Sequence, residues 1–417
     1  MKDVFLKKGV PVIPSLGNND VWPHNILLPG PNDITSHFSS IWQEFIPFPY
    51  RQVFQRGAYY SVEVIADHLA VVSLNTMYFY DANKAVNGCP FNELSDPGNL
   101  QLDWLEVQLK MFRERGLRVW LSGHVPPSRG NYFPECYVRY VDLALRYQDT
   151  ILGHLFGHMN SDHFFFLEAG DLELELDQQV AKTEIESTAD ADGDLYDAII
   201  DDFGTLPGLS KVELDEYAVI NVSPPVVPNP YLPTFRIFSY NVSGVEMTGN
   251  LEKKKKKKKK KKGGKRKPGH HRGGHGDKSV HCAEEPFRMS WKCHLSNDSW
   301  HSDPESPPRK NQRWTPTGYA QYYIPDLWNS GEGKHPQFRL EYTTYKADVL
   351  TSEDGPIPQK LLPKSLRNGT ITQSKYAPYG MSDLTVGSWY ELALRLGHSR
   401  GKKLGRRFKE YMYLGRE

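Results

Sequence analysis

The sequence predicts an α/β fold in which helices flank a layered β-structure. Between residues 59 and 156, apolar strand candidates alternate with helix candidates, which is the pattern of an α/β layered domain. The chain has 417 residues, 39% of them hydrophobic and 12% aromatic, so it can bury a large domain and a smaller one. Ligands of open α/β sheets bind beyond the carboxyl ends of the strands. Functional side chains are therefore expected at those ends.

The N-terminal strands are predicted from apolar runs and the residues that interrupt them. Gly9–Leu16 is apolar and stops at Gly17, which predicts a short buried strand. A loop rich in Pro, Asn and aromatic residues follows. The runs Tyr59–Ile65 and Leu69–Leu74 are separated by a short polar turn, which predicts a β-hairpin.

The clearest helix candidate is Asn99–Gly116. Its apolar residues recur every three or four positions, its first residue is a predicted N-cap and its last a predicted stop. A second helix is predicted over Tyr137–Gln148. Buried strands are predicted on either side of that helix, over Leu117–Ser122 and Thr150–Phe156.

The C-terminal half carries fewer predicted elements. Tyr217–Asn221 and Phe235–Tyr240 are strand candidates that flank a proline-rich bend and return the chain to the core. Arg339–Tyr345 is a further strand candidate, and one helix is predicted near Ser388–Leu396. No catalytic motif is recognised beyond about residue 286.

The formal net charge of +1 averages two opposed kinds of segment. Residues 253–278 contain 15 Lys and Arg and one acid, which leaves 36 basic and 49 acidic residues elsewhere. A ten-lysine run, Lys253–Lys262, leads this basic insert, and its composition predicts disorder. Two interpretations remain open: a solvated surface loop, or an electrostatic arm for a polyanion.

A second insert is acidic. Residues 168–216 carry 16 acids against two lysines, which predicts a solvated, flexible segment centred on about residues 178–210. Asp190, Asp192 and Asp194 resemble the start of a calcium loop. Leu195 stands where such a loop requires glycine, so an EF-hand is excluded.

Composition divides the chain into three parts. Residues 1–245 form the α/β domain, residues 246–285 a disordered Lys/His-rich insert, and residues 286–417 a C-terminal α+β extension. No run of about 18 apolar residues occurs, so no membrane span is predicted. No specific nucleic-acid partner is predicted.

The cysteines and sequons indicate an oxidising lumen. The four cysteines permit two disulfides in three possible connectivities, and no C-x-x-C pair indicates a zinc-thiolate site. Predicted glycosylation sites are Asn241, Asn297 and Asn368. The chain begins without a signal peptide, so a lumenal protein would need a targeting segment upstream of Met1.

Three apolar segments end abruptly in imidazole or amide side chains. Leu16-Gly17 leads into Asn18, Ser122-Gly123 into His124, and Phe156-Gly157 into His158. Neutral imidazoles and amide oxygens suit a borderline divalent ion such as Mn²⁺, Zn²⁺ or Fe²⁺. Glycine before each candidate allows the backbone to approach an ion closely. The sequence therefore predicts a metal site at these segment ends.

These segments resemble the ligand motifs of the calcineurin-like metallophosphoesterases, which usually read G-N-H-D/E, G-H and G-H-x-H. The longer strings LGNNDVWPHN, SGHVPPSRG and FGHMNSDHFF, which begin at Leu16, Ser122 and Phe156, are similar to fungal vacuolar endopolyphosphatases. The acid sphingomyelinases are more distant relatives. The resemblance covers nearly the whole chain outside the two inserts. It implies a metallophosphoesterase-type β-sandwich flanked by helices, and a vacuolar location on the lumenal side.

The resemblance also implies roles for particular residues. Asn18, His124 and His158 correspond to ligands of one ion in a two-metal site, and Asn160 stands where a histidine would bind the other. The metal is not distinguished among Mn, Mg, Zn, Co and Fe. Asn19 replaces the usual histidine that protonates the leaving group, and His24 is the predicted residual acid or phosphate contact.

The resemblance is incomplete at the N-terminus. The family's D-x-H and G-D-x-x-D/H motifs, which supply further ligands and the bridging aspartate, do not occur before Gly17. We therefore expect this chain to be an N-terminally truncated version of the enzyme, with an anchor upstream and little activity of its own.

Three functions follow as hypotheses. The first is an endopolyphosphatase, which hydrolyses internal phosphoanhydride bonds of inorganic polyphosphate to give shorter chains. The alternatives are a sphingomyelinase-like phosphodiesterase and a catalytically inactive polyanion-binding protein. Oligomeric state is not predicted.

Overall fold

The structure is a computed structural model that describes residues 2–173, 192–244, 282–327, 335–367 and 374–414, apart from 229, 286, 297–299, 301–302 and 353–354. Its centre is a six-stranded sheet in the order β1-β2-β3-β4-β6-β5. The strands are β1 (Tyr60–Ile65), β2 (Leu69–Ser73), β3 (Arg118–Ser122), β4 (Ile151–Phe156), β5 (His163–Glu168) and β6 (Tyr217–Val222).

The central strands of this sheet are parallel. β2, β3, β4 and β6 pair in parallel, whereas β1 and β5 are antiparallel strands at the two edges. The carboxyl ends of β3 and β4 therefore lie at the same edge of the sheet, as the sequence pattern predicted.

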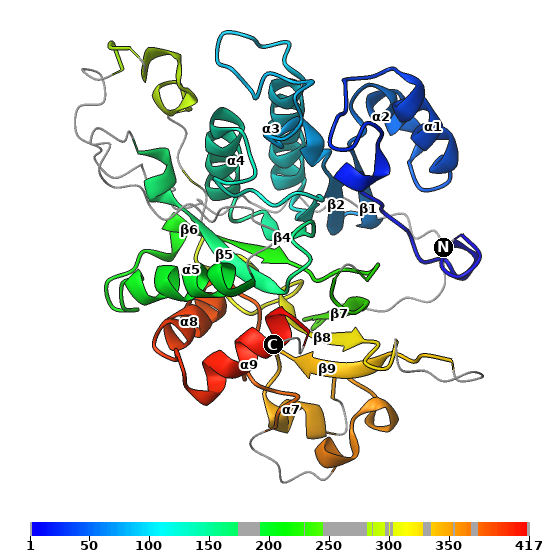
Figure 1. Cartoon of the computed structure of the whole chain (residues 1–417), viewed down its shortest axis with the longest axis vertical. Helices are drawn as coiled ribbons and strands as arrows, with labels where there is room; N and C mark the ends of the chain where they lie inside the picture. Colours follow the sequence, from blue (N-terminus) through cyan, green and yellow to red (C-terminus); the bar gives the residue numbers. More distant parts are fainter. Residues whose placement is uncertain are drawn as a thin grey trace, which may run out of the picture.

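Helices cover one face of the sheet. α3 (Pro97–Arg115) and α4 (Pro134–Arg146) lie on that face, with α1 (Asp33–Ile41) and α2 (Arg51–Gly57) beside β1 and β2 (Figure 1). The apolar residues that recur along α3 are buried in the main core, among them Leu102, Leu105 and Leu109. The stop at Gly116 is confirmed, because this residue adopts the left-handed conformation that ends a helix. The predicted cap at Asn99 is wrong, because Asp96 accepts the first backbone hydrogen bonds.

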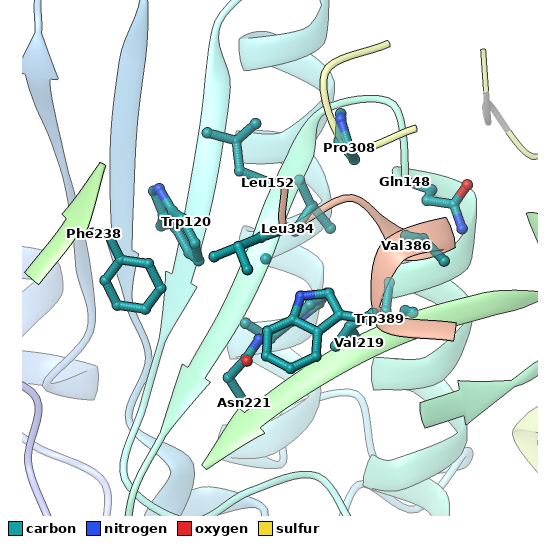
Figure 2. A pocket seen from close by; sticks show the side chains of 15 residues that line it. Trp120, Gln148, Leu152, Val219, Asn221, Phe238, Pro308, Leu384, Val386 and Trp389 are labelled. Atoms are coloured by element: carbon teal, nitrogen blue, oxygen red, sulfur yellow. The ribbon is translucent and has the colours of Figure 1, made fainter. Parts of the chain in front are cut away.

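A second sheet lies against the opposite face (Figure 1). It contains β7 (Thr234–Tyr240), β8 (Pro316–Tyr323) and β9 (Arg339–Thr343), all antiparallel. Trp120 of β3 packs against Phe238 and Tyr240 of β7 and joins the two sheets. Figure 2 shows that Leu384, which precedes helix α8 (Val386–Gly397), and Val386 and Trp389 of that helix close the apolar space beside them. The layered α/β architecture is thus confirmed, with a further antiparallel sheet.

The predicted strand over Gly9–Leu16 is wrong. This segment is extended but forms no ladder, and Pro11 and Pro14 lack the N–H groups that a central strand needs. It still runs beside the sheet, because the Ser73 hydroxyl donates to the Pro14 carbonyl at 2.9 Å. Asn18 therefore follows an extended segment rather than a strand.

The acidic insert is only partly as predicted. Its later part forms helix α5 (Asp192–Thr205), which packs on α8. Four side chains at helical spacing are buried there: Tyr196, Ile199, Ile200 and Phe203. The expectation of a solvated segment is wrong for these residues, because acids on the exposed face obscured the apolar stripe. The insert's residues 174–191 and the predicted disordered region 246–281, which includes the lysine run, lie outside the described residues.

In the described part of residues 286–417, two α-helices occur beyond the predicted one. They are α7 (Ala347–Thr351) and α9 (Lys403–Met412). Gly405 lowers the helical propensity of α9, which hid it in the sequence. A Cβ on Gly405 would lie 2.5 Å from the Ser399 carbonyl oxygen, so close packing requires glycine there. Across the described ranges, no helix has the length and apolar character of a membrane span.

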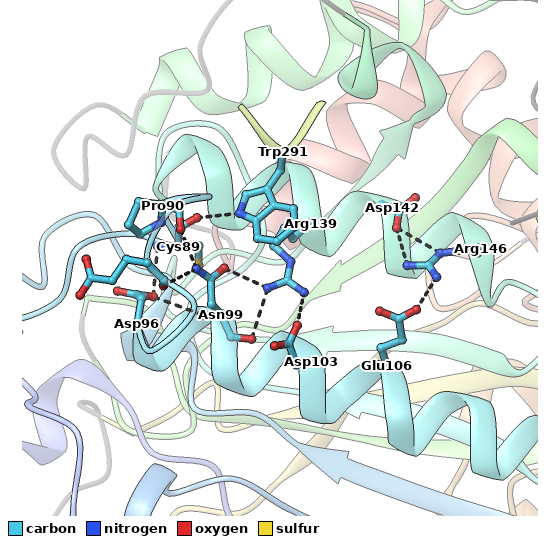
Figure 3. Close-up of polar contacts among 11 residues, drawn as sticks. Cys89, Pro90, Asp96, Asn99, Asp103, Glu106, Arg139, Asp142, Arg146 and Trp291 are labelled. Atoms are coloured by element: carbon cyan, nitrogen blue, oxygen red, sulfur yellow. Dashed lines mark hydrogen bonds and ion pairs between the residues drawn. The ribbon is translucent and has the colours of Figure 1, made fainter. Parts of the chain in front are cut away.

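Two disulfides form, Cys89–Cys136 and Cys282–Cys293. The second lies in a segment whose Trp291 docks on α4. The Trp291 indole donates to the Cys89 carbonyl at 2.8 Å and lies over the Arg139 guanidinium (Figure 3). Arg139 in turn bonds to Asn99 of α3 and pairs with Asp103. The segment that follows the basic insert is thereby fixed to the main domain.

Candidate metal centre

Asn18, His124 and His158 converge although 140 residues separate the first from the last. Asn18 begins a single turn of 3-10 helix, and His124 and His158 lie just beyond the carboxyl ends of β3 and β4. The Asn18 Oδ1 atom lies 2.7 Å from His124 Nε2 and 3.3 Å from His158 Nδ1. The two histidine nitrogens are 3.3 Å apart.

The two separations of 3.3 Å fit a shared cation, whereas the 2.7 Å between Asn18 Oδ1 and His124 Nε2 is the length of a hydrogen bond. With metal–nitrogen bonds of 2.0–2.1 Å, neighbouring tetrahedral ligand atoms lie about 3.3 Å apart. Burial lowers the pKa of His158 to about 3, with further lowering by His124 and His24, and burial also lowers the pKa of His124. Both imidazoles are therefore neutral at ordinary pH, as metal ligands must be. Within the described residues, no group of three His, Cys, Asp or Glu side chains forms a metal site, so this set depends on the asparagine.

The orientation of Asn18 is set by a neighbour that sequence reasoning missed. Its Nδ2 group donates to Asn25 Oδ1 at 2.9 Å, which turns its oxygen towards the histidines. Asn25 has a φ of 68°, in the left-handed region that asparagine tolerates. Asn25 was part of the quoted N-terminal string, but amide side chains in loops are too common to identify it without coordinates.

The loop after β4 is backbone-strained at two candidate ligands. His158 and Asn160 have φ values of 68° and 57°. Non-glycine residues in this region are uncommon and cluster at functional sites. Asn160 lines the same pocket as His158, but among the described residues no hydrogen bond joins its side chain to Asn18, His124 or His158. The structure thus brings three of the four predicted ligands into contact.

The predicted catalytic pair lies at the rim. His24 Nε2 is hydrogen-bonded to Asn19 Oδ1 and lies 3.4 Å from Asn18 Nδ2. Asn19 lines the pocket, whose volume is about 650 Å³. The opposite wall is mostly apolar and comes from two later segments, Pro224–Val227 and β7. Arg236 is the one cationic side chain that lines the pocket among the described residues.

No protein-family model matches the chain. Several curated proteins are nevertheless similar to it in sequence. An endopolyphosphatase of Cryptococcus neoformans is 38% identical over all of this chain and 72% of the relative. The chain belongs to the endopolyphosphatase family. The endopolyphosphatase of Schizosaccharomyces pombe is 32% identical over 93% of this chain and 62% of its own length. That of Saccharomyces cerevisiae is 46% identical over 37% of this chain and 23% of its own length.

In this endopolyphosphatase-family chain, the loop after β4 is held by the second sheet. Asp162, two residues after Asn160, pairs with Arg236 of β7. Its other carboxylate oxygen accepts from Gln321 of β8 at 2.7 Å and from Tyr342 of β9 at 2.5 Å. The Asp162 backbone N–H donates to the Met412 carbonyl at 3.0 Å. All three strands of the second sheet and the end of α9 thus fix the loop that carries His158.

Proposed function

We propose that this chain is a metal-dependent endopolyphosphatase that hydrolyses internal phosphoanhydride bonds of inorganic polyphosphate. The observation that carries the proposal is the convergence of Asn18, His124 and His158 at an open pocket. Membership of the endopolyphosphatase family supplies the substrate class. The chain spans 72% of the length of the Cryptococcus neoformans relative and 62% of that of the Schizosaccharomyces pombe relative. The activity of the whole relatives is therefore a proposal for this chain.

A divalent cation at these atoms would supply Lewis-acid polarisation of a phosphoryl oxygen. We assign Asn18, His124 and His158 to one ion of a two-ion site, and Asn160 to the other. The donor set of imidazole and amide suits Mn²⁺, Zn²⁺ or Fe²⁺ better than Mg²⁺, which prefers oxygen. Burial lowers the pKa of both imidazoles, which favours the neutral forms that can bind a metal.

The rim residues orient the substrate. His24 lies within hydrogen-bonding distance of Asn19 and Asn18, so a proton on its ring can be directed to a phosphate oxygen beside them. A phosphoanhydride leaving group is a weak base and needs less protonation than an alkoxide. The replacement of the usual histidine by Asn19 is therefore compatible with anhydride cleavage.

The test is the length distribution of products from long polyphosphate with Mn²⁺ present. Internal cleavage gives chains of intermediate length before monophosphate accumulates. His158→Ala should abolish cleavage and weaken Mn²⁺ binding, measured by calorimetry, about a hundredfold or more. His37→Ala is the matched control, because His37 is exposed on α1. Cleavage and Mn²⁺ binding equal to the parent in His158→Ala would contradict the proposal.

The apolar wall of the pocket favours a second candidate, a sphingomyelinase-like phosphodiesterase. Pro224–Val227 and Phe238 would suit a substrate that carries an apolar group beside its phosphate. Hydrolysis of bis(p-nitrophenyl) phosphate and sphingomyelin, with polyphosphate left intact, would favour this candidate. Binding of polyphosphate without cleavage of any substrate would instead favour the inactive polyanion-binding protein.

We propose an oxidising lumenal location, the vacuole in a fungal cell. Two disulfides support it, because cytosolic thiols are kept reduced. Of the predicted glycosylation sites, Asn241 is partly exposed, and Asn297 and Asn368 lie outside the described residues. Asn221, which also begins a sequon, is buried in β6. Thiol labelling of the protein in cells, before and after reduction, tests the location; free thiols before reduction would contradict it.

A further inference from the structure

Helix α9 and the turn before it locally reverse the charge of the protein. Residues 399–412 contain six Lys and Arg and a single acid, Glu410. Outside residues 253–278, by contrast, the chain has 36 basic and 49 acidic residues. The metal centre uses none of these cations. Figure 1 shows α9 next to α8, at the C-terminal end of the described chain.

Four of these six cations have no carboxylate partner in the part of the chain that the structure describes. Arg400 pairs with Asp197 and Asp201 of α5, and Arg407 pairs with Glu410. Lys409 lies over the Tyr196 ring. The remaining three are exposed: Lys402, Lys403 and Arg406. Lys402 and Arg406 donate only to nearby backbone carbonyls, those of His398 and Gly401.

The arrangement of these three cations opposes helix stability. Lys402 and Arg406 are four residues apart and adjacent to Lys403, so like charges face one another on one side of α9. They also occupy the first turns, where the helix dipole favours acids. Among the described residues, no ion pair with an acid offsets this repulsion. A bound anionic ligand would offset the repulsion between these cations.

This basic surface is connected to the candidate metal centre. The last residue of α9, Met412, accepts a hydrogen bond from the backbone of Asp162 in the loop that carries His158 and Asn160. Because α9 is ten residues long, its first turn lies about 15 Å from that contact. The length of α9 thus separates these cations from the loop that carries His158 and Asn160.

We propose that Lys402, Lys403 and Arg406 form a second binding site for the polyphosphate chain, outside the catalytic pocket. The inference rests on the proposed function. Internal cleavage requires the chain to extend beyond the pocket on both sides of the broken bond, and this site would hold one extension. A membrane surface fits less well, because the apolar face of α9 is buried and cannot insert: Phe408, Tyr411 and Met412.

The experiment compares two triple variants of the full chain. K402Q/K403Q/R406Q removes the site, and K110Q/K360Q/K364Q removes three exposed lysines elsewhere. Binding of long polyphosphate and of tripolyphosphate is measured in EDTA, so that no cleavage occurs. The site variant should bind long polyphosphate about tenfold more weakly, with a log–log salt slope smaller by about 2. Tripolyphosphate binding should be unchanged, and the control triple should match the parent.

The two hypotheses fail in different ways. Equal binding of long polyphosphate by the two triples would overturn the α9 site, even where the parent cleaves polyphosphate. The α9 site would also be overturned if K402Q/K403Q/R406Q bound anionic phospholipid vesicles more weakly than the parent but bound long polyphosphate equally well. A parent chain that binds long polyphosphate but leaves it uncut would refute the proposed function alone. All positions are exposed, and unchanged circular dichroism and Tm exclude misfolding.

Discussion

One side of the candidate pocket is formed by loops at the carboxyl ends of β3 and β4, and the other by Pro224–Val227 and by β7, a strand of the second sheet. The first side presents His124 and His158, the atoms that suit a cation. The second presents apolar side chains and Arg236, and it bonds to the first through Asp162. The first side thus supplies the candidate metal ligands, and the second fixes the position of the loop that carries His158.

The two sides also differ in how their polar groups are satisfied. On the first side, called the donor side below, Asn18 Oδ1, His124 Nε2 and His158 Nδ1 lie within hydrogen-bonding distance of one another, so a cation would replace these contacts. On the other side, called the holding side below, side chains of β7, β8 and β9 all bond to Asp162 of the loop, and Gln321 donates at 2.8 Å to Glu341 as well. The comparison predicts that mutations of the holding side act mainly on stability and those of the donor side on metal binding.

The largest effect is expected from Asp162→Asn. This change leaves the buried Arg236 cation without its counter-charge, and such losses typically cost about 3–5 kcal/mol of unfolding free energy. Denaturant unfolding measures it. Asp67→Asn is the matched control, because Asp67 also pairs with an arginine but its side chain is 85% exposed, so about 1 kcal/mol or less is expected. Equal losses of unfolding free energy in the two variants would contradict the proposed role of the second sheet in stability.

Glu341 gives the holding side a pH dependence. Burial raises its pKa to about 8, the hydrogen bond from Gln321 and the charge of Arg236 oppose the rise, and Asp162 and Glu410 add to it. The folded state therefore binds a proton that the unfolded state has released above pH ~4.5. This contribution to stability is complete below that pH and is lost as the pH rises through 8.

Stability should accordingly fall between pH 5 and 8 by on the order of a few kcal/mol, and Glu341→Gln should flatten that slope. Thermal unfolding across this range is the measurement. Glu63→Gln is the control: its hydrogen bond to Arg115 lowers the Glu63 pKa, so its contribution changes only at more acidic pH. If the stability of Glu341→Gln fell between pH 5 and 8 as steeply as that of the parent, the prediction would be wrong.

The donor side was predictable from sequence because its signals are local. An apolar run that ends in glycine and then in His or Asn can be recognised within a few residues, as at His124 and His158. Parallel strands then bring such ends together without further information. The segment before Asn18 misled only in its secondary structure, since its prolines allow an extended chain but no ladder.

The holding side was not predictable, because its contacts join residues far apart in sequence. Asp162 and Tyr342 are separated by 180 residues, and nothing near either one marks the pair. Helix α5 was missed for a different reason. Its apolar stripe was present, but the acids on its exposed face dominated the composition.

The smallest effect is expected from Gly17→Ala, which tests how the position of His124 affects metal binding. A Cβ on Gly17 would lie 3.0 Å from the His124 ring, so Gly17→Ala must displace that imidazole by a few tenths of an ångström. We expect about tenfold weaker Mn²⁺ binding, a typical cost of disturbing ligand orientation, with little change in Tm. Gly157→Ala is the matched control, because its nearest contact is the same ring at 4.0 Å. Its Mn²⁺ affinity should match the parent's. Loss of affinity in both variants, or in neither, would show that the position of His124 relative to Asn18 does not determine metal binding.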